Sequence, residues 1–126
     1  MPKPPVTLYG IRNCDTVKKA RQWLADQNVD YRFHDFKPQG VPIPQLDRWL
    51  LSVPWETLLN RQGTAWRKLD EVTKASVVNA ATARAVMLAN PSTIKRPVVE
   101  WDGTAAGTVT VGFNPGLWPA PAPKTD

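Results

Sequence analysis

The chain has 126 residues, of which 42% are hydrophobic and 21% are charged, and its 16 Lys and Arg against 11 Asp and Glu give a net charge of +5. These values are typical of one globular domain, and no apolar run of 18 residues indicates a membrane span. The only cysteine excludes an internal disulfide, and together with one histidine it is too little for a structural zinc site, so we expect no bound metal.

The charge pattern and the N-terminus limit the partners and the compartment. The basic residues are interleaved with acidic ones and form no stripe, so nucleic-acid binding is not expected. The first ten residues, MPKPPVTLYG, lack the apolar segment of a secretory signal. We therefore expect a cytoplasmic protein that does not bind membranes, and we expect it to be a monomer.

A strand followed by a helix is predicted near the start of the chain. Residues 6–10, VTLYG, are β-branched and aromatic and end in glycine, which is typical of a short strand. Asp15 or Thr16 is expected to cap a helix that ends near Asn28. One face of this helix is apolar at the expected spacing. It carries Val17, Ala20 and Leu24.

A second strand is predicted at 31–36, YRFHDF, where aromatic residues alternate with polar ones. A β-α-β unit needs a crossover connection, which favours parallel pairing of its two strands. After Lys37, the segment PQGVPIP contains three prolines and a glycine. We therefore expect the chain to leave the sheet at that point.

The middle of the chain, about 43–90, is predicted to be a helical insertion. The segment PQLDRWLLSV has Leu46, Trp49 and Leu50 on one helical face and ends before Pro54. Further helical stretches are expected in ETLLNRQGTAWRKLDEV and in the alanine-rich SVVNAATARAVMLAN, which stops at Pro91.

The sheet is predicted to resume at about 92–118. PVVEWDGT and GTVTVGF indicate an antiparallel hairpin with a turn at Asp102-Gly103. Leu117 and Trp118 are expected to dock on the fold, whereas the proline-rich end at 119–126 is expected to be flexible.

The predicted fold is α/β with a mixed sheet. Its two parts cover about 6–37 and 92–118, and the helical insertion separates them within one domain of residues 1–126.

Cys14 lies where the first strand turns into the first helix, and two interpretations of it are open. A thiolate at a helix N-terminus is stabilised by backbone N–H groups and by the positive end of the helix dipole, which lowers its pKa and makes it a nucleophile. Lys18 and Lys19 favour this state, whereas the carboxylate of Asp15 opposes it. Alternatively, Cys14 is a buried apolar residue, as free cysteines often are.

No second cysteine accompanies Cys14, because Val17 stands where a C-x-x-C motif would have one. A disulfide formed at Cys14 must therefore be resolved by a thiol from another molecule. Glutathione as co-substrate, or a glutaredoxin-like protein, is the expected supplier, and no bound cofactor is expected.

Three segments in order resemble the ArsC/Spx/YffB family, and the first is most similar to its YffB-like branch. They are YGIRNCDTVKKARQWL, LLNRQGTAWRKL and PSTIKRPVVE. The resemblance extends from Val6 to about Trp118 and implies a thioredoxin-like fold with an inserted helical subdomain. It also implies a thiol-dependent reductase similar to arsenate reductases.

The resemblance implies roles for individual residues. Cys14 would be the catalytic thiol, Arg61 and Arg96 would bind the anionic part of the substrate, and Pro97 would be a cis proline facing the cysteine. A guanidinium suits this role because it donates a fixed fork of N–H groups to oxyanions. The residues that flank the thiol are also expected to contact substrate. They are Asn13, Asp15 and Thr16.

Several of these residues also have an interpretation that involves no function. Arg61 lies in a polar stretch and is otherwise a solvated surface residue, and Arg96 otherwise only starts an edge strand. His34 is expected to be structural, since nothing pairs it with Cys14. The six tryptophans are expected to anchor the core.

Differences between this sequence and better-known members of the family limit the functions that it can be expected to have. Arsenate reductases of the group carry small and hydroxyl residues around the cysteine and a third arginine downstream, whereas here Asp15 follows the thiol and no arginine follows Arg96. The Spx-like regulators usually carry a C-x-x-C switch, which Val17 excludes. The sequence therefore predicts a glutathione-dependent thiol/disulfide oxidoreductase. The alternative is a non-catalytic Spx-like module that binds RNA polymerase.

Overall fold

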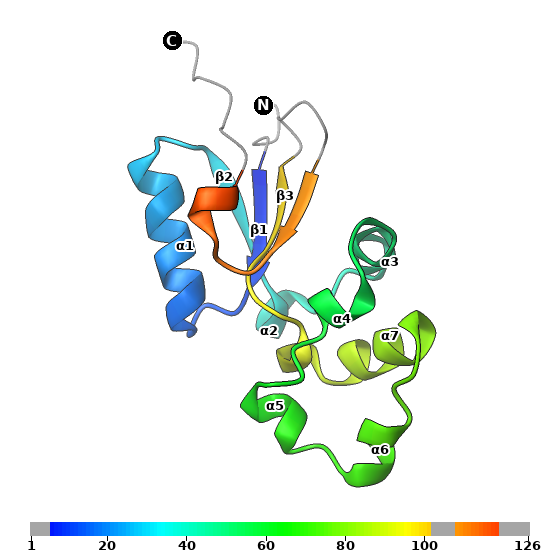
Figure 1. The fold of residues 1–126 in the computed structure, drawn as a ribbon. Helices are drawn as coiled ribbons and strands as arrows, with labels where there is room; N and C mark the ends of the chain where they lie inside the picture. The colour runs from blue at the N-terminus through cyan, green and yellow to red at the C-terminus, as the bar shows by residue number, and fades with distance from the viewer. Residues whose placement is uncertain (1–5, 102–107, 119–126) are drawn as a thin grey trace. The chain divides into compact units, whose positions relative to one another are not determined.

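The computed structural model describes residues 6–101 and 108–118. The chain separates into two compact units (Figure 1), one made of Met1–Phe36 with Arg96–Asp126 and one made of Lys37–Lys95. The first unit contains the sheet and the second is helical. That the two units form one domain stays a prediction.

A four-stranded mixed sheet forms the first unit. Strands β1 and β2 pair in parallel, as the β-α-β pattern predicts, whereas β3 pairs antiparallel with both β1 and β4. The order β2-β1-β3-β4 confirms the mixed α/β sheet expected of a thioredoxin-like fold. The predicted turn at Asp102-Gly103 and the predicted flexible end at 119–126 lie outside the described residues. The strands are β1 (Val6–Gly10), β2 (Tyr31–Asp35), β3 (Val98–Trp101) and β4 (Thr108–Val111).

Helix α1 (Asp15–Asp26) packs on one face of this sheet (Figure 1) and buries the three apolar residues that the sequence placed on its inner face. Trp118, which follows the 3-10 helix η2 (Pro115–Leu117), packs into the same core with only 8% of its surface exposed. The expected docking of Trp118 is therefore confirmed. Leu117 is 78% exposed, so the prediction that it docks is wrong.

The start of α1 differs from the sequence-based prediction, whereas its end agrees with it. Cys14, not Asp15 or Thr16, is the N-cap residue, because its backbone is extended and its carbonyl accepts the Lys18 N–H at 2.9 Å. At the other end Asn28 adopts φ 59°, and the Val29 N–H donates to the carbonyl of Leu24 at 2.9 Å. This left-handed Asn28 closes the helix where a stop was predicted.

The second unit is mostly helical, as predicted, but its helices are shorter than the sequence pattern suggested. The stretch 56–72 contributes to separate short helices instead of one long one. Pro54 and Gly63 are the N-cap residues of the first two of these helices. The side chain of Asp70 caps the third by accepting the Thr73 N–H at 2.7 Å. The elements are α2 (Phe36–Gln39), which starts at the end of the sheet unit, α3 (Ile43–Ser52), α4 (Trp55–Leu58), α5 (Thr64–Arg67), α6 (Glu71–Ala75), α7 (Ala80–Ala89) and the 3-10 helix η1 (Pro91–Thr93).

The last helix begins later than the sequence pattern suggested. Asn79 and Thr82 form a capping box, with each side chain paired to the other residue's backbone N–H, so Ser76–Val78 precede α7 rather than join it. None of the helices in the described ranges is both long and apolar enough to cross a bilayer.

Candidate active site

The loop that carries Cys14 is short and tightly packed at both ends. Gly10, the last residue of β1, is buried, and a Cβ atom placed on it would lie 2.7 Å from Cγ2 of Val17 in the first turn of α1. The glycine therefore lets the strand end approach the helix start closely. Ile11, the first residue of the loop, is only 6% exposed and so anchors the loop in the core. Cys14 is therefore held between β1 and α1, which both pack in the core.

Cys14 is a half-buried free thiol at the N-terminus of α1, with its side chain against the edge of the hydrophobic core. Burial raises the pKa of this thiol, but the Val17 N–H, the Arg96 guanidinium and the Thr16 N–H outweigh it, so that the pKa lies below its ordinary value. The Cys14 side chain does not cap the helix with a hydrogen bond, yet the backbone N–H groups of Thr16 and Val17 lie close enough to stabilise a thiolate. The structure thus favours the reactive interpretation of Cys14 over the sealed one.

Arg96 is the charged side chain that the structure brings to Cys14. Its guanidinium donates a hydrogen bond to the thiol and adds Coulombic attraction for the thiolate. The bond between Arg96 and Pro97 is cis, as the family resemblance implies. Arg96 comes directly before the segment that enters β3, the strand that pairs with β1, so the sheet register brings it to the Cys14 loop.

The other residues predicted to flank the substrate lie around the thiol. Asn13 and Asp15 are exposed, and Asp15 occupies the first turn of α1, where the helix dipole favours a negative charge. Thr16 is exposed and contributes its backbone N–H to the sulfur. Their roles in binding stay predictions.

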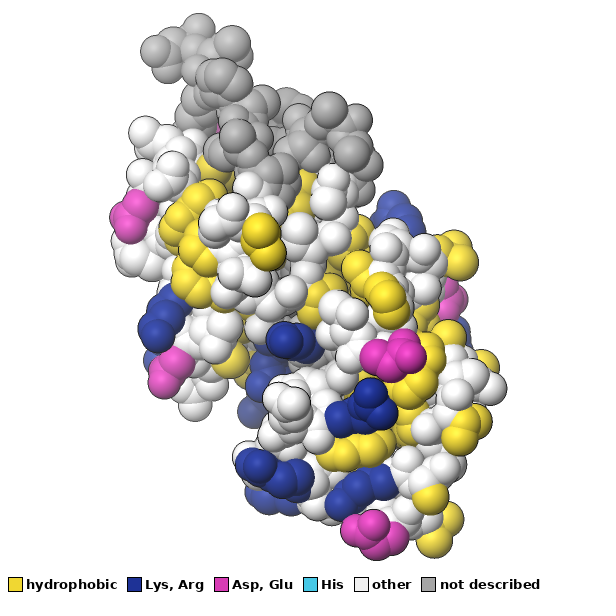
Figure 2. Space-filling view, viewed as in Figure 1, with side chains coloured by type: hydrophobic (Ala, Val, Ile, Leu, Met, Phe, Trp, Pro, Cys, Tyr) yellow, Lys and Arg dark blue, Asp and Glu magenta, His cyan; other side chains and the backbone are white. Residues whose placement is uncertain are grey.

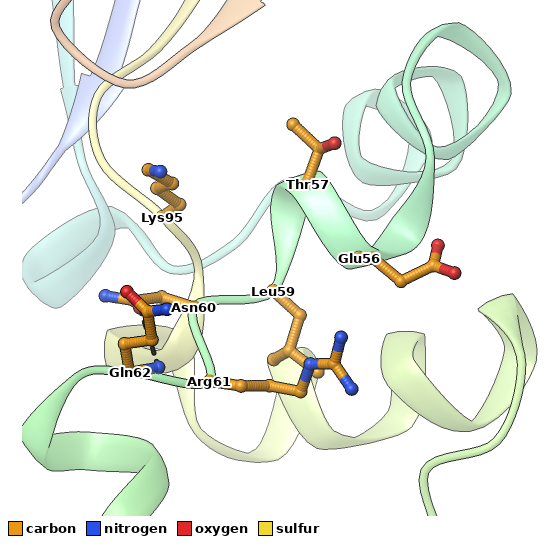
Figure 3. A pocket seen from close by; sticks show the side chains of 7 residues that line it. All are labelled: Glu56, Thr57, Leu59, Asn60, Arg61, Gln62 and Lys95. Carbon is orange, nitrogen blue, oxygen red and sulfur yellow. Dashed lines mark hydrogen bonds between the residues drawn. The ribbon is translucent and has the colours of Figure 1, made fainter.

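Arg61 belongs to the helical unit, and its place is described within that unit. It is exposed, and its guanidinium carbon lies 5.2 Å from the ring centroid of Trp55, which holds the side chain by a cation–π contact. Arg61 also lines a polar pocket between the end of α4 and Lys95 (Figure 3). Its predicted part in substrate binding stays a prediction.

The pocket contains residues that the sequence reasoning missed. Lys95 and Asn60 line it together with Gln62. Asn60 and Gln62 flank Arg61 in the second family-like segment, and Lys95 precedes Arg96 in the third. The lysine directly before Arg96 was the available signal in the sequence, but only the fold places it beside the Asn60 loop.

The histidine and three of the six tryptophans pack against other aromatic rings. The His34 ring lies 5.1 Å from that of Tyr9 and 6.0 Å from that of Phe36, which is the packing of a structural residue. Trp118 packs edge-on against Trp23 and Trp101, at 5.2 and 5.1 Å between centroids.

Comparisons with known proteins agree with the fold and with the resemblance. An uncharacterized protein from Haemophilus influenzae is 43% identical over 109 residues, which cover 86% of this chain and 91% of that protein. A solved structure named YFFB protein is 49% identical with a TM-score of 0.79, covering 88% of this chain and 93% of its own. The solution structure of an arsenate reductase (ArsC) related protein from Brucella melitensis is 52% identical with a TM-score of 0.68, covering 92% of both chains.

A model of the ArsC family matches residues 9–120, a range that contains Cys14, Arg61 and Arg96. With the family model matching most of the chain, and with close relatives covering nearly all of it, this chain belongs to the ArsC family.

Proposed function

We propose that this protein is a single-cysteine thiol/disulfide oxidoreductase that uses glutathione as its external reductant. The observation that carries the proposal is the half-buried thiol of Cys14, whose pKa is lowered at the start of α1 beside the guanidinium of Arg96. A lowered pKa places more of the sulfur in the thiolate form at neutral pH, and the thiolate is the attacking species.

The first step is attack by the Cys14 thiolate on one sulfur of a disulfide substrate. A new S–S bond forms to Cys14 while the substrate S–S bond breaks, and the departing thiolate takes the electron pair and then a proton from water. Arg96 stabilises the negative charge on sulfur before the attack, and its guanidinium suits an anionic group on the substrate afterwards.

The second step restores the enzyme with thiols from outside the chain. Because the chain has one cysteine, a glutathione thiolate must attack the mixed disulfide on Cys14. This attack leaves the first glutathione in a new mixed disulfide, and a second glutathione then attacks that disulfide and releases glutathione disulfide. Each substrate disulfide thus yields two thiols and one glutathione disulfide, so electrons balance. A glutaredoxin is a possible replacement for one of these glutathione steps.

Arsenate is a second substrate class for the same thiolate. The printed name of the Brucella melitensis relative supports testing it, while the carboxylate of Asp15 beside the sulfur repels the negatively charged arsenate ion. The alternative of a non-catalytic Spx-like module that binds RNA polymerase predicts that Cys14 is dispensable, and the lowered pKa of its thiol favours catalysis instead.

The deciding experiment assays reduced protein with glutathione against a panel of disulfides and arsenate, with and without glutaredoxin. We expect wild type to turn over at least one substrate and to form a glutathione adduct at Cys14, visible by mass spectrometry, and we expect Cys14→Ser to be inactive. Full activity in Cys14→Ser would refute the proposal. Equal recovery of RNA polymerase subunits by wild type and Cys14→Ser would favour the alternative.

A further inference from the structure

A small basic pocket lies within the sheet unit, on the surface between α1 and β2, which is a strand at the edge of the described sheet. Its volume is about 280 Å³. Neither Cys14 nor any group that lowers the pKa of its thiol lines this pocket, so it is distinct from the thiol site. The lining consists of four side chains of α1 and one of β2, which are Lys18, Arg21, Gln22, Ala25 and Tyr31.

The guanidinium of Arg21 is held in place by aromatic side chains of β2. Its Nε donates a hydrogen bond to the Tyr31 hydroxyl at 3.0 Å, and its Cζ lies 4.2 Å from the ring centroid of Phe33. Together these contacts fix the planar group against the strand. The two terminal nitrogens form no hydrogen bond with any described residue, so they can bind an oxyanion as a fork.

The charges of the pocket are not compensated by carboxylates. Lys18 and Arg21 form no ion pair within residues 6–101 and 108–118. The two acidic residues of α1, Asp15 and Asp26, lie at its ends, and Asp26 accepts a hydrogen bond from Gln22 Nε2 at 2.8 Å. The basic residues of α1 lie between them, and Figure 2 shows basic side chains on the surface over this helix. An anion is therefore attracted to this face of α1.

The spacing of the two cations favours a ligand with two negative charges. Lys18 and Arg21 are three positions apart on α1, and side chains at this spacing are neighbours on the helix surface. Their positive charges repel one another unless an anion lies between them. A carboxylate neutralises one of them, whereas a dianion neutralises both. The Tyr31 hydroxyl accepts from Arg21 and so retains its own O–H as a further donor.

We propose that this pocket binds the doubly charged phosphoryl group of a phosphate monoester, an inference that goes beyond the proposed reductase and does not depend on it. Such a group carries nearly two negative charges at neutral pH and three acceptor oxygens, which match the two cations and the donors of the pocket. A water molecule takes up about 30 Å³ of the liquid, so the phosphoryl oxygens leave part of the pocket free. The organic group of the ester occupies that part, beside Ala25 and the Tyr31 ring.

Binding is tested by a ¹H–¹⁵N NMR titration of the full chain with phenyl phosphate. We expect saturable shifts of the amides of residues 18–25 and 31–32. Benzoate carries the same ring with a single charge and is expected to bind at least about tenfold more weakly, as loss of a charge-assisted hydrogen bond predicts. Equal affinity for benzoate, or no saturable shift with phenyl phosphate, would overturn the proposal.

Inorganic phosphate, titrated in parallel, distinguishes the free ion from the ester. We expect it to shift the same amides but to saturate at a higher concentration than phenyl phosphate, because it leaves the space beside Ala25 and Tyr31 unfilled. Saturation by inorganic phosphate at an equal or lower concentration would overturn the assignment to a monoester.

Variants test the two cations. Lys18→Gln and Arg21→Gln are each expected to weaken binding of phenyl phosphate about tenfold. Because Lys18 is exposed, its replacement leaves the buried face of α1 intact even where Arg21→Gln disturbs the contacts with β2. Lys19→Gln is the matched control, since this lysine is also exposed but does not line the pocket. Equal weakening by Lys18→Gln and Lys19→Gln would mean that general positive charge binds the anion, and would overturn the site.

The thiol provides the last control, because a thiol site with an arginine is also able to attract an anion. Cys14→Ser is expected to bind phenyl phosphate as wild type does, since Cys14 does not line the pocket. Loss of binding in Cys14→Ser, or shifts confined to residues 10–16, would place the ligand at the thiol and overturn the proposal.

Discussion

The guanidinium of Arg96 donates a hydrogen bond to the thiol of Cys14 and attracts its thiolate. The two residues lie far apart in sequence but in the same compact unit, one before α1 and one before β3. Because β1 and β3 are paired neighbours in the sheet, the segments that adjoin them lie side by side. The environment of the thiol is therefore a product of the sheet topology as well as of the helix N-terminus.

Replacing Arg96 by glutamine is expected to raise the pKa of Cys14, because both the hydrogen bond and the positive charge are lost. Near neutral pH, alkylation by iodoacetamide should then become several-fold slower than in wild type. The difference should vanish at alkaline pH, where both thiols are ionised. Rates measured across a pH series check both expectations.

Arg12 provides the matched control for this experiment. It is an exposed arginine in the same loop as Cys14 but is not among the groups that shift the pKa of the thiol. Arg12→Gln should leave the pH profile of alkylation unchanged. Equal effects of the two substitutions would show that general positive charge, rather than the contact with Arg96, lowers the pKa.

The pH dependence of stability offers a second test that needs no substrate. The folded chain holds the pKa of Cys14 below its ordinary value of 9.0, so between the two values the unfolded chain binds more protons. The thiolate therefore stabilises the fold above pH 9, and this contribution is lost as the pH falls through the folded pKa. The free energy of unfolding of wild type relative to Cys14→Ser should rise with pH and level off near pH 9. Urea denaturation under reducing conditions measures it, and a flat or falling difference would contradict the prediction.

The sheet unit was predictable because its signals are local. The β-branched and aromatic residues of 6–10 and the alternation of residues in 31–36 indicate strands, and the spacing of Val17, Ala20 and Leu24 marks the buried face of α1. The N-cap residue of α1 was not predictable from the capping preferences of the amino acids alone. Asp15 and Thr16 are better capping residues than cysteine, but the tight approach of Gly10 to the helix start makes Cys14 the first capping position.

The helical unit and its pocket were less predictable because they depend on distant contacts. The apolar spacing of 56–72 fits a helix, yet Leu59 leaves helical geometry to pair with Ile94. That pairing also brings Lys95 to Asn60, a juxtaposition that no local pattern contains. At the thiol, Arg96 was identified by family resemblance, while its hydrogen bond to Cys14 required the coordinates.

The close packing of Gly10 against Val17 predicts a specific loss of stability. Gly10→Ala would place its new methyl group 2.7 Å from Cγ2 of Val17 and should cost about 1–3 kcal/mol of unfolding free energy. Combining it with Val17→Ala should cost less than the sum of the two single changes, because the smaller side chain makes room. Gly116→Ala, with nothing within 4 Å of the new atom, is the control and should change stability little. Additive effects in the double variant would mean that another contact is responsible.

The buried hydrogen bond from Tyr9 to Glu100 stabilises the first unit without touching the thiol. The Tyr9 hydroxyl donates to Oε1 of Glu100 at 2.7 Å, and the two residues are 5% exposed each. Tyr9→Phe leaves a buried carboxyl group without this donor and should cost about 1–3 kcal/mol. Tyr31→Phe is the matched control, since its hydroxyl accepts only a part-buried bond from Arg21 at 3.0 Å, and it should cost less. Urea denaturation measures both, and the rate of Cys14 alkylation should stay unchanged in each. A larger loss in Tyr31→Phe would show that burial of the Tyr9–Glu100 pair does not determine its energetic contribution.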